Sequence, residues 1–255
     1  AVTPPRVVCQ FSCGAASAVA TKLALAKYGA THEVAIINAF IVEEGEDNRR
    51  FLADCERWFG RTVTVLRDGK YGASTYELWK RKRFMVSHKG APCSRELKRK
   101  LLDEFRRPDD IVIFGFTVEE RDRYEDFVER YPAIRAEAPL IDANLDKAAC
   151  LAMVERAGIR LPVDYLDGFN NANCSGECPK GGMGHWNRMR VVRPAGFARM
   201  MAAQEEIGPG SYFFRNRKTG ERFGLKDLPP DAGRHDEPLP ACGFFCELAE
   251  QEYAA

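Results

Sequence analysis

Cysteine is the residue type whose number and spacing most clearly indicate chemistry in this chain of 255 residues. Nine cysteines occur, and the C-x3-C pairs Cys174/Cys178 and Cys242/Cys246 lie outside the expected strands and helices, whereas Cys9/Cys13, which has the same spacing, begins within an expected strand. In a reducing compartment, grouped cysteines are more often metal ligands or redox groups than structural disulfides. The thiolate is both the nucleophile and the metal ligand. The pairs therefore predict metal binding or thiol redox chemistry.

A second stretch with chemical potential is "VVCQFSCGAASAVATKLALAKYG", residues 7–29, in which an apolar strand passes through small residues into a helix. A helix N-terminus presents N–H groups and the positive end of its dipole to an anion. Small side chains at 12–17 would let a phosphate approach the backbone, although tight packing alone is the alternative. The stretch is neither a G-x-x-x-x-G-K-[ST] nor a G-x-G-x-x-G motif. The candidate anion-binding residues are Ser12, Cys13, Gly14, Ala15 and Ser17.

Alternating apolar runs and amphipathic stretches must position these groups. We expect strands at 7–11, 32–40, 62–66, 110–116 and 138–141, and helices at 16–28, 47–59, 74–86, 94–106, 118–131 and 146–158. This alternation predicts an α/β fold with a parallel five-stranded sheet flanked by helices. Ligands of such sheets bind beyond the carboxyl ends of the strands, near a switch in strand order. The turns at 12–17 and 116–123 are therefore the expected binding loops.

The composition and the periodicity of the sequence change after about residue 162. Residues 168–190 are rich in Asn, Gly and Cys and have no strand or helix period. A helix is expected near 194–207 and a hairpin within 212–225. We therefore expect an α/β domain at 1–160 and an irregular, Cys-rich C-terminal extension at 161–255 that packs over the binding site.

Charge and hydropathy exclude several classes of protein. There are 38 basic and 37 acidic residues, so a net charge of +1 gives no broad basic field for nucleic acid, although a local patch would be allowed. No apolar run approaches the roughly 20 residues that span a bilayer, and the first residues lack a signal-peptide core. We therefore expect a cytoplasmic protein with no membrane contact.

Four motifs resemble those of the phosphoadenosine phosphosulfate (PAPS) reductase family, within the adenine-nucleotide alpha-hydrolase (PP-loop) superfamily, and its phage and bacterial iron–sulfur relatives. They are "FSCGAAS" (11–17), "GAPCSRELKRKLL" (90–102), "IVIFGFTVEERDR" (111–123) and "NANCSGECPKGGMGHWNRMR" (171–190). The resemblance implies a PP-loop (HUP-type) sheet that binds an adenine nucleotide of the PAPS, APS or ATP class at 12–17, with Mg²⁺ as an optional companion. It also implies phosphate or sulfate contacts from Lys98, Thr117, Arg121 and Arg123, for which a solvated helix face is the alternative.

The resemblance to iron–sulfur members implies a [4Fe–4S] cluster, which takes four thiolates. The implied ligands are Cys93, Cys174, Cys178 and Cys246. Zinc suits four cysteines equally, and a redox disulfide is a third reading. Cys93 follows a turn, so we expect it at the surface near the strand ends.

The tail also carries Cys242-Gly243, which resembles the family's C-terminal Cys-Gly, whose thiolate attacks the sulfur of the bound nucleotide. Cys242 is therefore the expected catalytic residue, although the sequence does not decide which of Cys242 and Cys246 is the nucleophile. His185 could be a ligand, with an exposed loop histidine as the commoner case. Trp186, among basic residues, would suit stacking on a nucleobase.

The remaining cysteines have simpler explanations. Cys9 lies within an expected buried strand, and Cys55 and Cys150 lie on apolar helix faces, so we expect core positions for all three. Cys13 stands in the loop where the resembled family usually has glycine, and a small residue in place of glycine is the favoured account.

Three functions follow from the resemblance. The first is a PAPS reductase-like oxidoreductase with a thiol reductant protein as partner. The second is an ATP-dependent adenylating sulfurtransferase or desulfurase that acts on a nucleic acid, although Ala16 replaces the aspartate of ATP-cleaving members. The third is an inactive nucleotide-binding regulator. Sulfite or adenosine bisphosphate as product would identify the first, and pyrophosphate with AMP the second.

Overall fold

The computed structural model describes residues 4–87, 90–172 and 174–236. The chain divides into two compact units. The first comprises the residues up to 40 together with 46–66 and 101–162, and the second comprises 41–45, 67–100 and the residues from 163 onward. The division after residue 162 lies close to the expected boundary at 160, whereas residues 67–100 belong with the C-terminal part of the chain.

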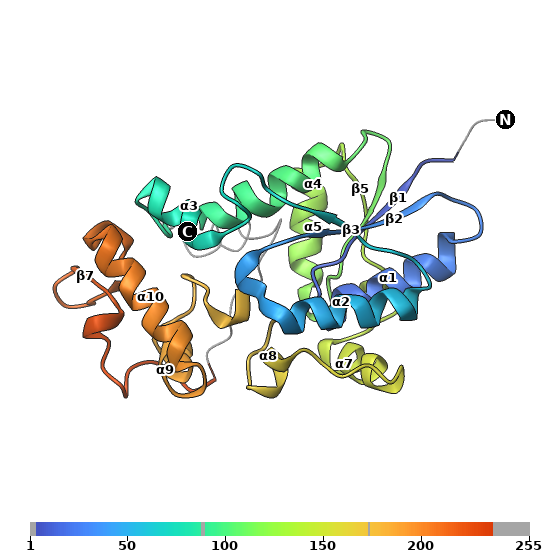
Figure 1. Ribbon diagram of the computed structural model, residues 1–255. Coiled ribbons are helices and arrows are strands. Elements are labelled where there is room, and N and C mark those ends of the chain that lie inside the picture. Colours follow the sequence, from blue (N-terminus) through green and yellow to red (C-terminus); the bar gives the residue numbers. More distant parts are fainter. Residues whose placement is uncertain (1–3, 88–89, 173, 237–255) are drawn as a thin grey trace. The chain divides into compact units, whose positions relative to one another are not determined.

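The first unit is built on a parallel sheet. Its strands are β1 (Val7–Gln10), β2 (Val34–Ala39), β3 (Thr64–Leu66), β4 (Ile111–Ile113) and β5 (Arg135–Glu137), in the order β3-β2-β1-β4-β5 (Figure 1). All neighbouring pairs are parallel, and Val7 of β1 is in register with Val34 on one side and Ile111 on the other. The predicted α/β fold with a five-stranded parallel sheet flanked by helices is confirmed.

Helices cover both faces of this sheet. They are α1 (Ala15–Tyr28), α2 (Gly45–Phe59), α4 (Lys100–Phe105), α5 (Arg121–Arg130), α6 (Pro139–Asp142) and α7 (Lys147–Arg156). Right-handed crossovers place α1 and α2 on one face, where Figure 1 shows them together with α7. On the other face, Leu102 and Phe105 of α4 pack against Val8 and Ile37.

The prediction of a fifth strand at 138–141 was wrong. Those residues begin α6, with Pro139 in its first turn, and the fifth strand is the preceding segment Arg135–Glu137. Proline is favoured at the first helical position because the N–H that it lacks would have no partner there. The apolar pair that follows Pro139 therefore packs from a helix, while a polar three-residue strand forms the edge of the sheet.

A buried ion pair joins the amino ends of the two central strands. Arg6 precedes β1 and Asp110 precedes β4, and Nε and Nη2 of Arg6 donate to the two carboxylate oxygens of Asp110 at 3.0 and 2.7 Å. Nη2 of Arg6 also donates to Phe105 O at 3.1 Å. Burial opposes ionisation of Asp110, but hydrogen bonds from Arg6 and from the Arg107 N–H outweigh it and lower the pKa of Asp110.

The second unit is mostly helical. Its elements are α3 (Thr75–Lys82), a π-helical segment (Ser94–Arg99), α8 (Val163–Leu166), α9 (Met183–Val192), α10 (Pro194–Ile207) and the antiparallel pair β6 (Phe214–Arg215) and β7 (Arg222–Phe223). Trp79 of α3, Trp186 of α9 and Met200 of α10 are fully buried in one apolar core. The predicted helix at 194–207 and the predicted hairpin are confirmed.

Residues 168–190 were expected to lack a helix, and this was wrong for their second half. Helix α9 begins at Met183, directly after Gly182, and buries His185, Trp186 and Met189 on one side. The sequence did not reveal this helix because glycines precede it and because its ten residues are too few for the apolar positions to repeat clearly.

Within the described residues, no helix is long and apolar enough to cross a membrane.

Candidate functional site

The loop that follows β1 is closed by two serines. The Ser12 N–H donates to Ser17 Oγ at 3.2 Å, and the two hydroxyl oxygens lie 3.1 Å apart. Ser17 Oγ donates in turn to Gly14 O at 3.1 Å. Ser17 is buried and Ser12 is exposed, so the inner hydroxyl organises the turn while the outer one faces its mouth.

The loop contains one residue in a conformation that favours glycine. Cys13 has φ +61° and is fully buried, whereas Gly14 is extended at φ −103° and ψ 160°. The left-handed region costs an ordinary residue roughly 1–2 kcal/mol. The position at which glycine would relieve strain is therefore 13, whereas Gly14 has a backbone conformation that any residue adopts.

Helix α1 starts from this loop with no acidic group near its N-terminus. Its N-cap is Gly14, which offers no side-chain cap, and its first turn contains no acidic residue. The helix has 14 residues, so its dipole places about half a positive charge at this end. No carboxylate in that turn offsets this charge, and the arrangement favours an anion.

Asn38, in β2, is a residue of this site that sequence reasoning missed. Its Nδ2 donates to Phe11 O at 2.9 Å and to Cys13 Sγ at 3.5 Å. The side chain is 2% exposed, and its Oδ1 has no hydrogen-bond partner among the described residues. A buried carbonyl oxygen without a partner costs about 1–3 kcal/mol, so a donor from a ligand or from water would be favoured there. The signal that could have identified Asn38 is its amide side chain near the carboxyl end of an otherwise apolar strand, VAIINA.

The loop after β4 packs directly on the loop after β1. A Cβ added to Gly115 would lie 2.9 Å from both the Cα and the N of Ser17 and 3.3 Å from the C of Ala16. Strands β1 and β4 are neighbours, and the chain changes direction across the sheet between them. The two loops thus meet at the topological switch point, the usual ligand position in open parallel sheets.

The other predicted residues of the β4 loop form a helix start. The Thr117 N–H and hydroxyl donate to Glu120 Oε2 at 3.2 and 3.3 Å, in a capping box. Arg123 pairs with the other carboxylate oxygen of Glu120 and lies 5.9 Å from the Phe116 ring centroid. Arg121 is exposed at the first position of α5. Thr117 and Arg123 therefore shape the turn, while Arg121 extends from the start of the helix.

Lys147 is a further cation near this turn that sequence reasoning did not single out. It begins α7, and its N–H donates to Glu119 Oε1 at 3.3 Å. Burial lowers the pKa of its ammonium group, although the nearby Glu119 and Glu120 oppose that shift.

Lys98 lies in the second unit, in the π-helical segment, and forms an ion pair with Glu44 at 2.7 Å. Both side chains are largely buried. The predicted phosphate contact is therefore a lysine whose charge is already shared with a carboxylate.

Cysteines 9, 55 and 150 are core residues, as predicted. All three are fully buried, and burial raises the pKa of their thiols to about 12, 12 and 11 respectively. These thiols stay protonated at neutral pH and are poor nucleophiles.

Cys93, Cys174 and Cys178 lie in the second unit and are buried, so the expectation that Cys93 lies at the surface was wrong. Cys93 and Cys174 belong to the same apolar core, which also includes Leu97. Among the described residues, no group of three or more His, Cys, Asp or Glu side chains could hold a metal ion. Cys93, Cys174 and Cys178 therefore do not form a ligand set by themselves. The other predicted ligand, Cys246, and the predicted nucleophile, Cys242, lie outside the described residues.

The backbone from Cys174 to Cys178 is held in an unusual shape. Cys174, Ser175 and Gly176 have φ of +47°, +52° and +81°, three successive left-handed residues. Strain of this kind persists only where the surroundings impose it. The next residue, Glu177, is anchored by Tyr76 and Arg199, and sequence reasoning identified none of these three residues.

His185 was expected in an exposed loop, and this was wrong. It lies in α9 with its ring buried, and its Nε2 is 2.6 Å from Gly176 O, so it supports the turn between the two cysteines. Trp186 is also fully buried and is not placed to stack on a base. Nearby, Arg188 and Arg190 donate to backbone carbonyls.

In comparisons with known proteins, the chain matches no family model, no curated protein and no solved structure.

Proposed function

We propose that the first unit binds an adenine nucleotide through the loop at 12–17, and that the protein is a PAPS reductase-like enzyme of sulfur chemistry. The observation that carries the proposal is the approach of Gly115 to Ser17, where a Cβ would lie 2.9 Å from the backbone. Two loops in such close contact at a switch point form one binding surface rather than two independent turns.

The electrostatics of this surface support a phosphate group. The α1 dipole is not offset by a carboxylate in its first turn, and the exposed Ser12 hydroxyl lies beside it. Arg121 begins α5 directly after the β4 loop and could contact a phosphate or sulfate. Oδ1 of Asn38, which has no hydrogen-bond partner among the described residues, would accept a hydrogen bond from the ligand or from a bound water.

The chemistry that the family resemblance implies is thiol attack on sulfur. A cysteine thiolate would form an S–S bond to the sulfur of the nucleotide's sulfate, and the S–O bond to the phosphate would break, so that the nucleotide leaves. A thiol of a reductant protein would then attack the cysteine sulfur and release sulfite, leaving a disulfide. Cys242, the candidate nucleophile, lies outside the described residues. Because the described cysteines form no three-ligand group, no step of this proposal passes through a metal cluster.

Binding of the 3′-phosphoadenosine 5′-phosphate product, measured by calorimetry, tests the site. Gly115→Ala should weaken binding about tenfold or more, because its Cβ would push the two loops apart. Gly69→Ala is the matched control, because Gly69 is exposed and a Cβ there meets nothing within 4 Å. Equal affinity in both variants would contradict the proposed site.

Product analysis separates the functions. Sulfite and adenosine bisphosphate from PAPS, in the presence of a dithiol, would support the proposal. Pyrophosphate and AMP from ATP would establish the adenylating sulfurtransferase or desulfurase instead. Binding with no turnover of either nucleotide would establish a nucleotide-binding regulator.

A further inference from the structure

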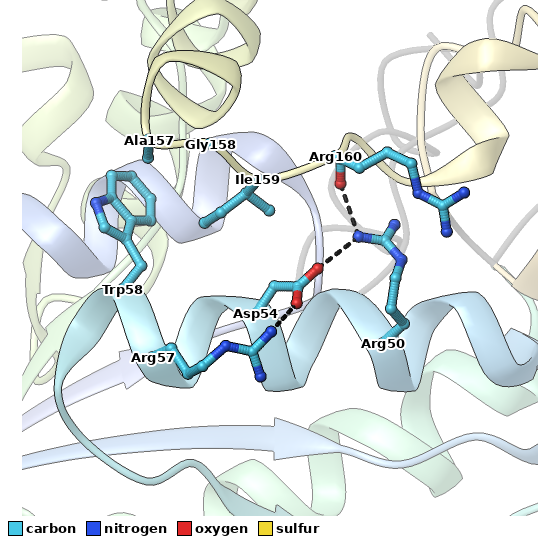
Figure 2. Close-up of a pocket in the computed structure, with 8 residues that line it drawn as sticks. All are labelled: Arg50, Asp54, Arg57, Trp58, Ala157, Gly158, Ile159 and Arg160. Atoms are coloured by element: carbon cyan, nitrogen blue, oxygen red, sulfur yellow. Dashed lines mark hydrogen bonds and ion pairs between the residues drawn. The ribbon is translucent and has the colours of Figure 1, made fainter.

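The first unit contains a cavity that the proposed nucleotide site does not use. It has a volume of about 500 Å³ and lies between α2 and the segment after α7 (Figure 2). Helices in parallel sheets run back from the carboxyl ends of the strands to the amino ends. Trp58 in the last turn of α2 and Ala157 just beyond α7 therefore lie at the opposite end of the helical layer from residues 12–17.

One end of the cavity is apolar. Figure 2 shows Trp58 facing Ala157, with Ile159 beside them. Trp58 is half-buried, and its indole stacks on Phe59 at 6.0 Å between ring centroids. Lys22 Nζ lies 5.6 Å from the centroid of the indole and donates to the backbone carbonyl of Trp58 at 2.6 Å. A rigid, partly exposed indole is a suitable surface for a planar ring.

The other end is cationic. Arg50 forms the wall, because it donates to Arg160 O at 2.8 Å and to Asp54 at 2.8 Å. At this end Arg160 pairs with Asp47 and remains 66% exposed, whereas Arg57 lies on the Trp58 side of the cavity, where it pairs with Asp54 and is 72% exposed (Figure 2). The three guanidinium groups share two carboxylates, those of Asp47 and Asp54, so one positive charge is in excess.

We propose that this cavity binds a nucleoside monophosphate, with the base against Trp58 and the phosphate at Arg160. Its volume lies within the range of small-molecule sites. Guanidinium groups match phosphate oxygens with paired hydrogen bonds, and an indole stacks on any nucleobase. A ligand with a flat ring at one end and an anion at the other uses both ends of the cavity. This proposal stands independently of the proposed function.

Intrinsic fluorescence with UMP as the probe tests it. Of the three tryptophans, Trp79 and Trp186 are fully buried in the second unit, so quenching by a stacked base reports on Trp58. We expect saturable quenching by UMP, and at least tenfold weaker binding of uridine or inorganic phosphate alone. Arg160→Ala should weaken UMP binding roughly tenfold, the value of one charge-assisted hydrogen bond. Arg130→Ala, an exposed arginine of α5, should change nothing.

Two variants separate this cavity from the loop at 12–17. Gly14→Val should leave UMP quenching unchanged, because Gly14 lies at the other end of α1, and a loss there would assign the binding to the loop. Trp58→Phe keeps a ring in the cavity, so calorimetry should still detect UMP binding. Quenching that does not saturate, or equal UMP affinity in the wild type and Arg160→Ala, would overturn the proposal.

Discussion

Glu177 and Arg199 form a two-point ion pair in the second unit, between the cysteine segment and helix α10. Arg199 Nε donates to Glu177 Oε2 at 2.9 Å, and Nη2 contacts Oε1. The Tyr76 hydroxyl donates to the same carboxylate, which is 3% exposed. The hydrogen bond to Glu177 raises the pKa of Arg199, and burial raises the pKa of Tyr76, so both groups keep their protons. Because Glu177 precedes Cys178 directly, this contact anchors the C-x3-C segment.

Releasing this anchor should expose the two thiols. Glu177→Ala removes the partner of Tyr76 and Arg199, and we expect a loss of roughly 1–3 kcal/mol in the free energy of unfolding. Alkylation of Cys174 and Cys178, followed by mass spectrometry under native conditions, should become faster. Glu125→Ala, at an exposed position on α5, is the control. Unchanged alkylation rates at both cysteines would show that Glu177 does not hold the segment.

The left-handed backbone at Cys13 predicts opposite outcomes for two substitutions. Cys13→Gly should stay within about 1 kcal/mol of the wild type, because relief of strain offsets the lost thiol contact with Asn38 and the greater freedom of the unfolded chain. Cys13→Val should lose roughly 2–3 kcal/mol, because a β-branched residue is poorly accommodated at φ +61°. Urea unfolding measures both. Equal stability of the two variants would mean that the turn relaxes out of the left-handed region.

The ion pair between Arg6 and Asp110 should make the first unit sensitive to acid. The folded-state pKa of Asp110 is lowered, so its contribution is present above the unfolded pKa near 3.9 and is lost as the pH falls through the folded value. Asp110→Asn should be less stable than the wild type by about 3 kcal/mol at pH 7. That difference should shrink below about pH 4, as measured by urea unfolding at pH 7, 5 and 3. A difference that stays constant with pH would contradict the assignment.

The metal content of the purified protein tests whether the cysteines bind an iron–sulfur cluster, zinc or no metal. The [4Fe–4S] cluster that the family resemblance implies, completed by Cys246 outside the described residues, would give about four irons per chain, with matching acid-labile sulfide, in protein purified without oxygen. Cys174→Ala should lose the iron, whereas Cys150→Ala, a substitution in the core of the first unit, should retain it. About one zinc per chain would favour the tetrahedral alternative. Protein with neither metal would leave thiol redox chemistry without a metal.

The sequence predicted the sheet well because its central strands are short runs of buried apolar residues. VVCQ in β1 and IVI in β4 are almost entirely buried, as continuous apolar runs in the centre of a parallel sheet usually are. The edge was mispredicted because Arg135–Glu137 is polar and three residues long, while the apolar pair after Pro139 resembles a strand. Short edge elements are decided by their neighbours rather than by their own residues.

The candidate site was predicted in part for a similar reason. The loop at 12–17 has a local signal, namely small residues at the start of a helix, and Gly115 after β4 packs on it. That this loop binds a nucleotide stays a prediction. Asn38 and Glu177 act through contacts with residues distant in sequence, so the sequence does not reveal their partners. The burial of Cys93 and His185 likewise depends on a core assembled from 67–100 and the residues after 163.

That division of the chain has a consequence for synthesis. Residues 67–100 emerge from the ribosome before residues 101–162, yet Leu78 and Trp79 of α3 are buried among partners that follow residue 163. The apolar side of α3 therefore stays exposed to solvent until residues 101–162, which complete the first unit, have been translated. Production of the protein should consequently depend on chaperone supply and on translation rate more than its size alone would suggest.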